Sequence, residues 1–144
     1  KYGWMEEDLE LLFGCCCKKE GGLVILGGDL VYDDDLSAAL ADTLAWMLSA
    51  FRCPRCPAPV AYLSIERRIV FTLEALAPVP HAYLAFLKLL KGQNLKATVL
   101  FDSGRGSQGE LSAGLVDGWE QEEVPQLVDY ERGSDIVLLR ISTR

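Results

Sequence analysis

The stretch from Leu23 to Asp35, LVILGGDLVYDDD, constrains the fold of this chain more than any other. Its first four residues, Leu23–Leu26, are all apolar. An unbroken apolar run predicts a strand buried on both faces, because a half-buried strand would alternate. The two glycines that follow remove side chains where the strand ends, so a ligand or another backbone segment can approach closely. Asp29 and Tyr32 then come at the carboxyl end of the strand, where open α/β sheets bind their ligands.

The remaining pattern alternates between helices and strands. Asp34 or Asp35 is predicted to cap a helix whose apolar residues recur at helical spacing as far as Phe51. Further strands are predicted at Val60–Ile65, Leu95–Phe101, Val124–Tyr130 and Ile136–Ile141, and further helices at Ile69–Leu76 and His81–Lys91. A short glycine-containing link joins the last two strands, which predicts an antiparallel hairpin. The chain is therefore expected to be an α/β protein, with a parallel sheet and an antiparallel hairpin at its edge.

Composition excludes several classes of function. The net charge is −7, and the 14 lysines and arginines form no stripe, so direct nucleic-acid binding is not expected. No apolar run approaches the roughly 20 residues that cross a bilayer, so no membrane association is expected. The glycine-rich segment 102–122 has little hydrophobic pattern and is predicted to be a flexible insertion.

The five cysteines lie in two clusters, Cys15–Cys17 and the pair Cys53 and Cys56. An odd number with three in succession is a poor disulfide framework, which favours reduced thiols in an intracellular protein of the nucleus or cytoplasm. The pair also matches half of a zinc site or a redox motif, but a zinc site needs four ligands and a redox pair opens a helix. We expect loop cysteines and no bound metal.

Several segments of the chain resemble one known family. Leu26–Leu36, Ala61–Arg68 and Phe71–Leu73 are similar to the seven-strand methyltransferases of family 16, and so are Pro125–Arg132 and Tyr2–Trp4. The segments occur in the family's order and cover most of the chain, apart from residues 102–121 and the two cysteine loops. The resemblance implies a partial Rossmann-like fold, consisting of strands four to seven with their helices.

The resemblance also implies roles for individual residues. Asp29 and Tyr32 correspond to the family's Asp-x-x-Tyr signature at the end of strand four, beside the reacting methyl group and the incoming lysine. Gly28 precedes the signature, where the family usually has alanine, and approaches the cofactor through its backbone. Trp4 corresponds to a tryptophan against the adenosine end of S-adenosyl-L-methionine (AdoMet). The residue types suit the chemistry, since a carboxylate can orient an amine and a tyrosine ring can face a cation.

One part of the family's cofactor site has no counterpart in the chain. The glycine-rich loop after strand one and the acid after strand two both precede strand four in the family, and neither fits within residues 1–22. Gly104–Gly109 is not a substitute, because no helix is predicted after it. Residues 1–144 are therefore expected to be the carboxyl-terminal half of a methyltransferase domain, which alone would be inactive and bind AdoMet poorly.

The sequence thus predicts a fragment of an AdoMet-dependent protein-lysine N-methyltransferase that acts on a non-histone protein. Its expected partner is a protein substrate that presents a lysine. Three alternatives remain open: a non-catalytic fragment that binds proteins through an exposed sheet edge, part of a methyltransferase for a small molecule, and a zinc or thiol module.

Overall fold

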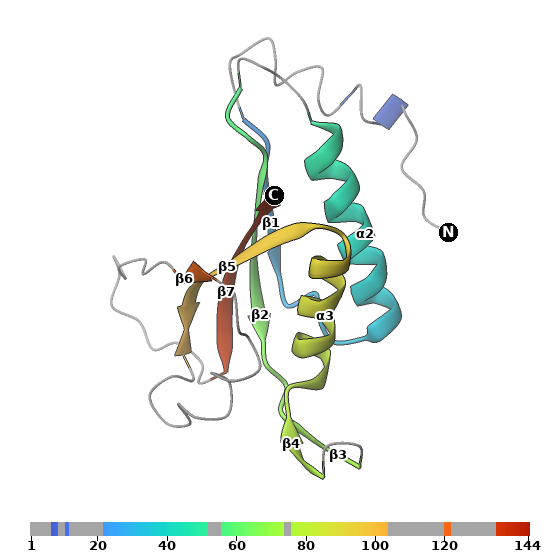
Figure 1. Ribbon diagram of the computed structural model, residues 1–144, viewed down its shortest axis with the longest axis vertical. Coiled ribbons are helices and arrows are strands. Elements are labelled where there is room, and N and C mark those ends of the chain that lie inside the picture. Colours follow the sequence, from blue (N-terminus) through green and yellow to red (C-terminus); the bar gives the residue numbers. More distant parts are fainter. Residues whose placement is uncertain are drawn as a thin grey trace.

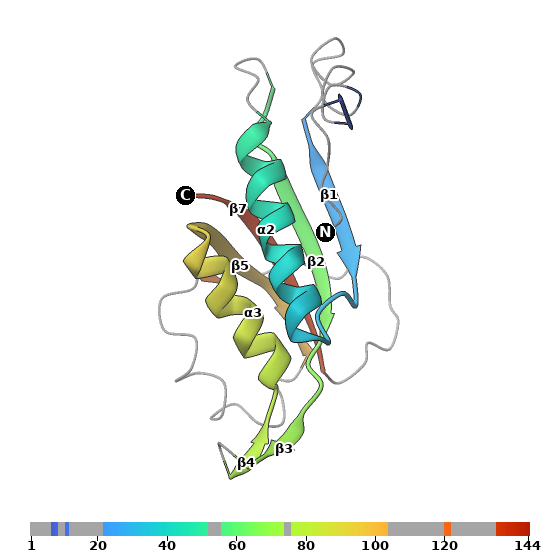
Figure 2. The ribbon, with the colours of Figure 1, turned by 90° about the vertical axis from the view of Figure 1, so that its right-hand side faces the viewer.

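The computed structural model describes residues 7–8, 11, 22–51, 56–73, 76–103, 120–121 and 135–144. Within them, a five-stranded mixed sheet has the order β1-β2-β7-β5-β6. The strands are β1 (Val24–Gly28), β2 (Val60–Glu66), β5 (Leu95–Asp102), β6 (Glu120–Gln121) and β7 (Ile136–Thr143). Two helices, α2 (Asp34–Ala50) and α3 (His81–Gly92), both pack on one face of this sheet (Figures 1 and 2). The α/β class predicted from the sequence is confirmed.

The last strand, β7, lies inside the sheet. It pairs antiparallel with β2 on one side and with β5 on the other, whereas β1 and β2 pair in parallel. The predicted position at the edge is therefore wrong. Every second residue of β7 is buried, so one face of the strand packs in the core. Its backbone groups pair with β2 and β5 on both sides, whereas an edge position would leave one side unpaired. The other half of the predicted hairpin, 124–130, lies outside the described residues.

The N-cap of helix α2 is not Asp34 or Asp35, as predicted, but the preceding residue, Asp33. Its side chain accepts a hydrogen bond from the Leu36 backbone N–H at 2.9 Å. The two aspartates predicted as caps instead occupy the first turn, where their charges interact favourably with the helix dipole. The helix otherwise runs to Ala50 as its apolar periodicity predicts, and α3 confirms the helix predicted from His81.

The helix predicted at Ile69–Leu76 is wrong. The structure has a two-stranded hairpin there, formed by β3 (Val70–Thr72) and β4 (Ala77–Val79), which projects beyond the start of α3 (Figure 2). Valine, phenylalanine and threonine favour strands, and the Pro78 ring lacks the N–H that a helix interior needs. Several apolar side chains of this segment are exposed, among them Phe71 at 64% and Leu73 at 85%.

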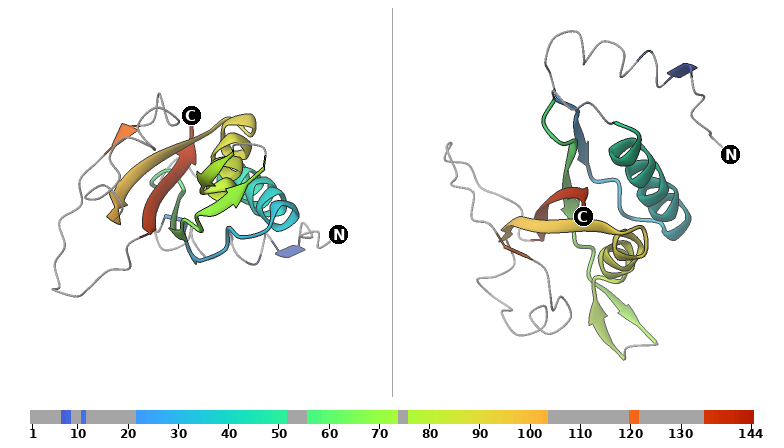
Figure 3. Two further views of the ribbon diagram at one scale, coloured as in Figure 1. Left: turned by 90° about the horizontal axis from the view of Figure 1, so that it is seen from below. Right: turned by 45° about the horizontal axis from the view of Figure 1, so that its top comes forward.

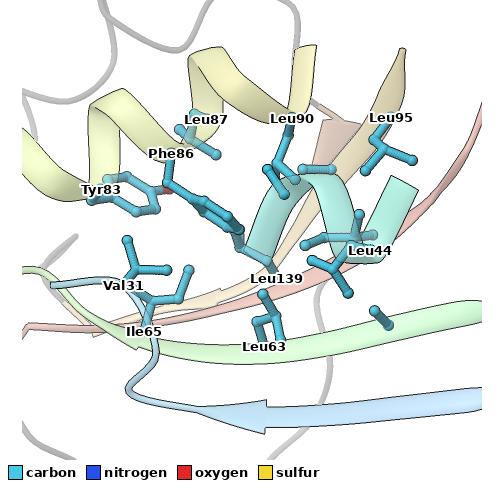
Figure 4. Packing of buried hydrophobic residues seen from close by; sticks show 14 of the residues in the cluster. Val31, Leu44, Leu63, Ile65, Tyr83, Phe86, Leu87, Leu90, Leu95 and Leu139 are labelled. Carbon is cyan, nitrogen blue, oxygen red and sulfur yellow. The ribbon is translucent and has the colours of Figure 1, made fainter. Parts of the chain in front are cut away.

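The hydrophobic core lies between the helices and the sheet. From α3, Phe86 and Leu90 are fully buried and point toward Leu63 of β2 and Leu139 of β7 (Figure 4). Leu44 of α2 packs into the same cluster. Burial of a large apolar side chain contributes about 1.5–3 kcal/mol, so this one interface supplies most of the apolar stabilisation of the fold.

The opposite face of the sheet is covered by neither helix (Figure 3). On β1, which is an edge strand of the sheet, Val24 is 55% exposed and Leu26 is 78% exposed. The prediction that this strand is buried on both faces is therefore wrong among the described residues. Its outward side chains are apolar but have no covering layer in the part of the chain that the structure describes.

The predicted insertion at 102–122 is described only at its ends. Asp102 belongs to β5, and Glu120–Gln121 forms β6 in parallel with β5, so the first residue of the predicted insertion is part of the sheet. Residues 104–119 lie outside the described part. No described helix is long and apolar enough to span a membrane.

Tyr83 gives the fold a specific dependence on alkaline pH. Its burial raises the pKa of the phenol from 10.0 to about 12, and the nearby Asp102 carboxylate adds to this shift while Arg67 opposes it. The protonated form is favoured in the folded state. The contribution of Tyr83 to the free energy of unfolding is therefore fully present below pH 10 and is lost as the pH rises from 10 to 12. We expect urea unfolding to show a loss of about 2–3 kcal/mol over this window.

The matched variant is Tyr83→Phe, which has no titrating group at this position. The other tyrosines titrate in both proteins, so the difference between the two stability curves isolates Tyr83. We expect the variant to lose less stability above pH 10 than the wild type; parallel curves would contradict the assigned cause.

Candidate functional site

The candidate site lies at the carboxyl ends of β1 and β2, beside the start of α2 (Figure 2). Directly after β1, Asp29 adopts a left-handed backbone conformation with φ of 49°. This conformation is tolerated by aspartate better than by most residues. The Asp29 backbone N–H donates to the Ser64 carbonyl at 2.8 Å, which ties the turn to β2. Val31, two residues on, is 1% exposed and anchors the loop in the core.

The two glycines before this turn have different surroundings. A Cβ at Gly27 would lie 2.7 Å from Leu63 Cδ2 and 2.9 Å from Leu30 Cδ1, so Gly27 lets these side chains pack against the strand. Gly28 is exposed, and a Cβ there would have no atom within 4 Å. The backbone of Gly28 is therefore open to an approaching ligand, as expected from its position in the sequence.

The side chains of Asp29 and Tyr32 meet at one cation, the guanidinium of Arg68. Arg68 donates from Nη2 to Asp29 Oδ2 at 2.9 Å, and its Cζ lies 5.5 Å from the centroid of the Tyr32 ring. Glu66 Oε2 is 3.8 Å from Arg68 Nε. All four side chains are about half exposed, so the cluster faces solvent. Two carboxylates and an aromatic face thus surround a single positive charge.

The neighbouring residue, Arg67, fixes the backbone from which Arg68 projects. Its guanidinium forms a bidentate ion pair with Asp102, with Nη2 at 2.6 Å and Nη1 at 3.1 Å from the two carboxylate oxygens. The two side chains are only 8% and 13% exposed. The Arg67 backbone N–H also donates to the Asp135 carbonyl at 2.7 Å, which joins the end of β2 to the start of β7. Arg67 Nε has no hydrogen-bond partner within the described part of the chain.

A β-bulge brings Asp102 to this ion pair. The register of β5 with β7 shifts between Val99 and Phe101, so Asp102 pairs with Val137. Paired residues share a face of the sheet, and Val137 is fully buried on the helix side. Without the extra residue, Asp102 would point to the opposite face, because side chains alternate along a strand. The bulge therefore directs the carboxylate toward Arg67.

The structure describes three of the four predicted site residues, Gly28, Asp29 and Tyr32. It brings Asp29 and Tyr32 together, and it leaves the Gly28 backbone accessible. Trp4, predicted to contact the cofactor, lies outside the described residues. Of the two cysteine clusters, only Cys56 is described, and the described residues contain no group of three or more metal-ligating side chains.

The residues that sequence reasoning missed are Glu66 and Arg68. Glu66 is the last residue of β2, and Arg68 follows two residues later. The carboxyl ends of parallel neighbours meet at one edge of a sheet, so the position of both residues at the end of β2 was a usable signal. The single histidine, His81, lies beside the first turn of α2. His81 Nε2 is 3.8 Å from Asp34 Oδ2, at the start of both helices.

Comparisons with known proteins add no family to these observations. No protein-family model matches the chain, and a search of curated proteins finds no match. The structure itself shows a mixed α/β domain in which Asp29, Glu66 and Tyr32 surround the guanidinium of Arg68 at the carboxyl ends of two parallel strands.

The two glycines provide a direct test of this local geometry. We expect Gly27→Ala to lower the free energy of unfolding by about 1–2 kcal/mol, because its Cβ forces Leu63 and Leu30 out of their positions. Gly28→Ala has free space, and we expect it to be neutral or to stabilise the strand by about 0.5 kcal/mol. Urea unfolding of the two variants beside the wild type measures both effects. Equal losses in the two variants would contradict the difference in packing.

Proposed function

We propose that this chain supplies the carboxyl-terminal half of an AdoMet-dependent protein-lysine N-methyltransferase of family 16. Within that family, the sequence segments resemble methyltransferase-like protein 22. The observation that carries the proposal is the arrangement of Asp29 and Tyr32 around the guanidinium of Arg68 at the end of β1. These are the two positions that the family signature assigns to the reacting lysine.

The topology of the sheet supports the same proposal. The short strand β6 extends the sheet beyond β5. The other four strands, in the order β1-β2-β7-β5, are three that run in one direction and one reversed strand, β7, between β2 and β5. This arrangement is typical of strands four, five, seven and six in the seven-strand methyltransferase fold. The sequence alone predicted the order of elements along the chain but placed the reversed strand at the edge.

The described residues suit one wall of a methyl-transfer site. Bound AdoMet supplies a sulfonium methyl group, and the open space over Gly28 admits a ligand to the strand end. The Asp29 carboxylate and the Tyr32 ring would hold the lysine ammonium group. Once that group has lost a proton, the Asp29 carboxylate would orient the neutral amine so that its lone pair faces the methyl group. Placement of the amine in line with the methyl group contributes much of the rate in such displacements. We propose that water takes the lysine proton, and that an amino-terminal half outside these 144 residues holds the methionine end of the cofactor.

The test is AdoMet-dependent methylation by the longer protein that contains this chain. Labelled AdoMet and a cell extract with low methylation are the substrates, and methyl-lysine is measured by mass spectrometry after hydrolysis. We expect Asp29→Asn to lower the rate of lysine methylation about a hundredfold, because the neutral amide no longer positions the ammonium group. Asparagine tolerates the left-handed conformation at this position, so the fold is expected to remain.

The matched control is Asp42→Asn, the same chemical change half-way along α2, where Asp42 is exposed and accepts a hydrogen bond from Gln93. We expect this variant to retain wild-type methylation. Retained binding of AdoMet in Asp29→Asn, measured by calorimetry, would place the loss at the lysine rather than the cofactor. Unchanged turnover in Asp29→Asn would refute the proposed role.

A second candidate function rests on a different observation, the uncovered edge strand. Beside the exposed apolar side chains of β1, the strand pairs only with β2 among the described residues. Such an edge can accept an extended peptide as an additional strand. Two results would favour this non-catalytic function: a partner protein that binds through β1, and the absence of methyl transfer by the parent protein.

A further inference from the structure

We propose that Arg68 is an intramolecular competitor that occupies the place of the substrate lysine and must leave it before the substrate binds. The inference rests on the proposed function and adds a residue that sets the apparent affinity for the substrate. It assigns the cluster of Asp29, Tyr32 and Glu66 as a site for a cationic side chain, which this chain fills with its own arginine in the structure.

The geometry of Arg68 is that of a bound cationic ligand. One carboxylate, Asp29, accepts a charge-assisted hydrogen bond from Nη2 at 2.9 Å, and the Oε2 of a second carboxylate, Glu66, lies 3.8 Å from Nε of the same guanidinium. The Tyr32 ring covers the same group at 5.5 Å. An ammonium group of lysine can make the same kinds of contact, since both cations donate to carboxylates and both are attracted to aromatic faces.

Arg68 can leave this site without disturbing the fold. Its side chain is 47% exposed, and the partners Asp29 and Glu66 are each more than half exposed. By contrast, the backbone at Arg67 is held by the buried ion pair with Asp102 and by the Asp135 carbonyl. Only the side chain of Arg68 therefore needs to move, and it has solvent to move into.

Competition by Arg68 should lower the apparent affinity for a lysine side chain by a measurable factor. A ligand whose site is open for only part of the time binds with an apparent affinity lowered by that fraction. An exposed ion pair and an exposed cation–π contact together stabilise the closed form by an amount that corresponds to a factor of roughly 3 to 30. Removal of the guanidinium is expected to raise the affinity for a lysine side chain by this factor.

The experiment is an NMR titration of the isolated chain with Nα-acetyl-lysine methylamide at low ionic strength. The Asp29 amide and the Tyr32 ring protons report on binding, in the wild type and in Arg68→Gln. We expect the variant to bind the probe about tenfold more tightly. Lys91→Gln is the matched control, because it removes one positive charge from the last turn of α3, at the opposite end of that helix from His81. We expect this control to bind as the wild type does.

A second measurement in the wild type separates displacement from a simple loss of charge repulsion. The side-chain Nε–H signal of Arg68 is followed during the same titration. We expect it to move toward the position of a solvated arginine with the same midpoint as the Tyr32 ring signals. Binding of the probe while the Arg68 signal stays unchanged would overturn the proposal.

The outcomes distinguish this inference from the function on which it rests. Equal binding by wild type and Arg68→Gln at Asp29 and Tyr32 overturns the competitor role and leaves the lysine site in place. Absence of any shift at these two residues in both proteins overturns the lysine site itself. Tighter binding in Arg68→Gln, together with release of Arg68 in the wild type, supports the competitor role.

Discussion

The buried ion pair between Arg67 and Asp102 is the interaction on which the arrangement of this protein depends. It joins the end of β2 to the end of β5, across the strand β7 that lies between them. Both side chains are nearly inaccessible to solvent, so loss of one partner would leave an uncompensated charge in the interior. The β-bulge in β5 makes this contact possible, because it turns Asp102 to the helix side of the sheet.

The candidate site is built outward from that fixed point. Arg67 holds the backbone after β2, and Arg68 therefore projects toward the turn that follows β1. That turn is itself tied to β2 through the hydrogen bond from Asp29 to the Ser64 carbonyl. A buried polar contact thus positions an exposed cation, Arg68, beside Asp29 and Tyr32. A fixed backbone at Arg67 with an exposed side chain at Arg68 suits a site that binds and releases a charged side chain. This arrangement links the fold to the proposed methylation of lysine.

Sequence patterns predicted the elements with strong, local signals. The long periodic helix α2, the apolar strands β2 and β5, and the helix that begins at His81 all occur near their predicted bounds. Asp29 and Tyr32 follow a strand, β1, as the sequence predicted. The position of β7 depends on which strand it pairs with, and the face of Asp102 depends on a bulge, so neither follows from local periodicity. Contacts between distant segments, such as Arg68 with Asp29, likewise needed the assembled sheet.

The most direct test of this account is a double-mutant cycle on the buried ion pair, followed by urea unfolding. Arg67→Met and Asp102→Leu are each predicted to lower the free energy of unfolding by about 3–5 kcal/mol, because each leaves a buried charge without its partner. The double variant is predicted to lose far less than the sum, since both charges are then replaced by apolar side chains. Additive losses in the double variant would contradict the claim that this pair holds the site-forming end of the sheet together.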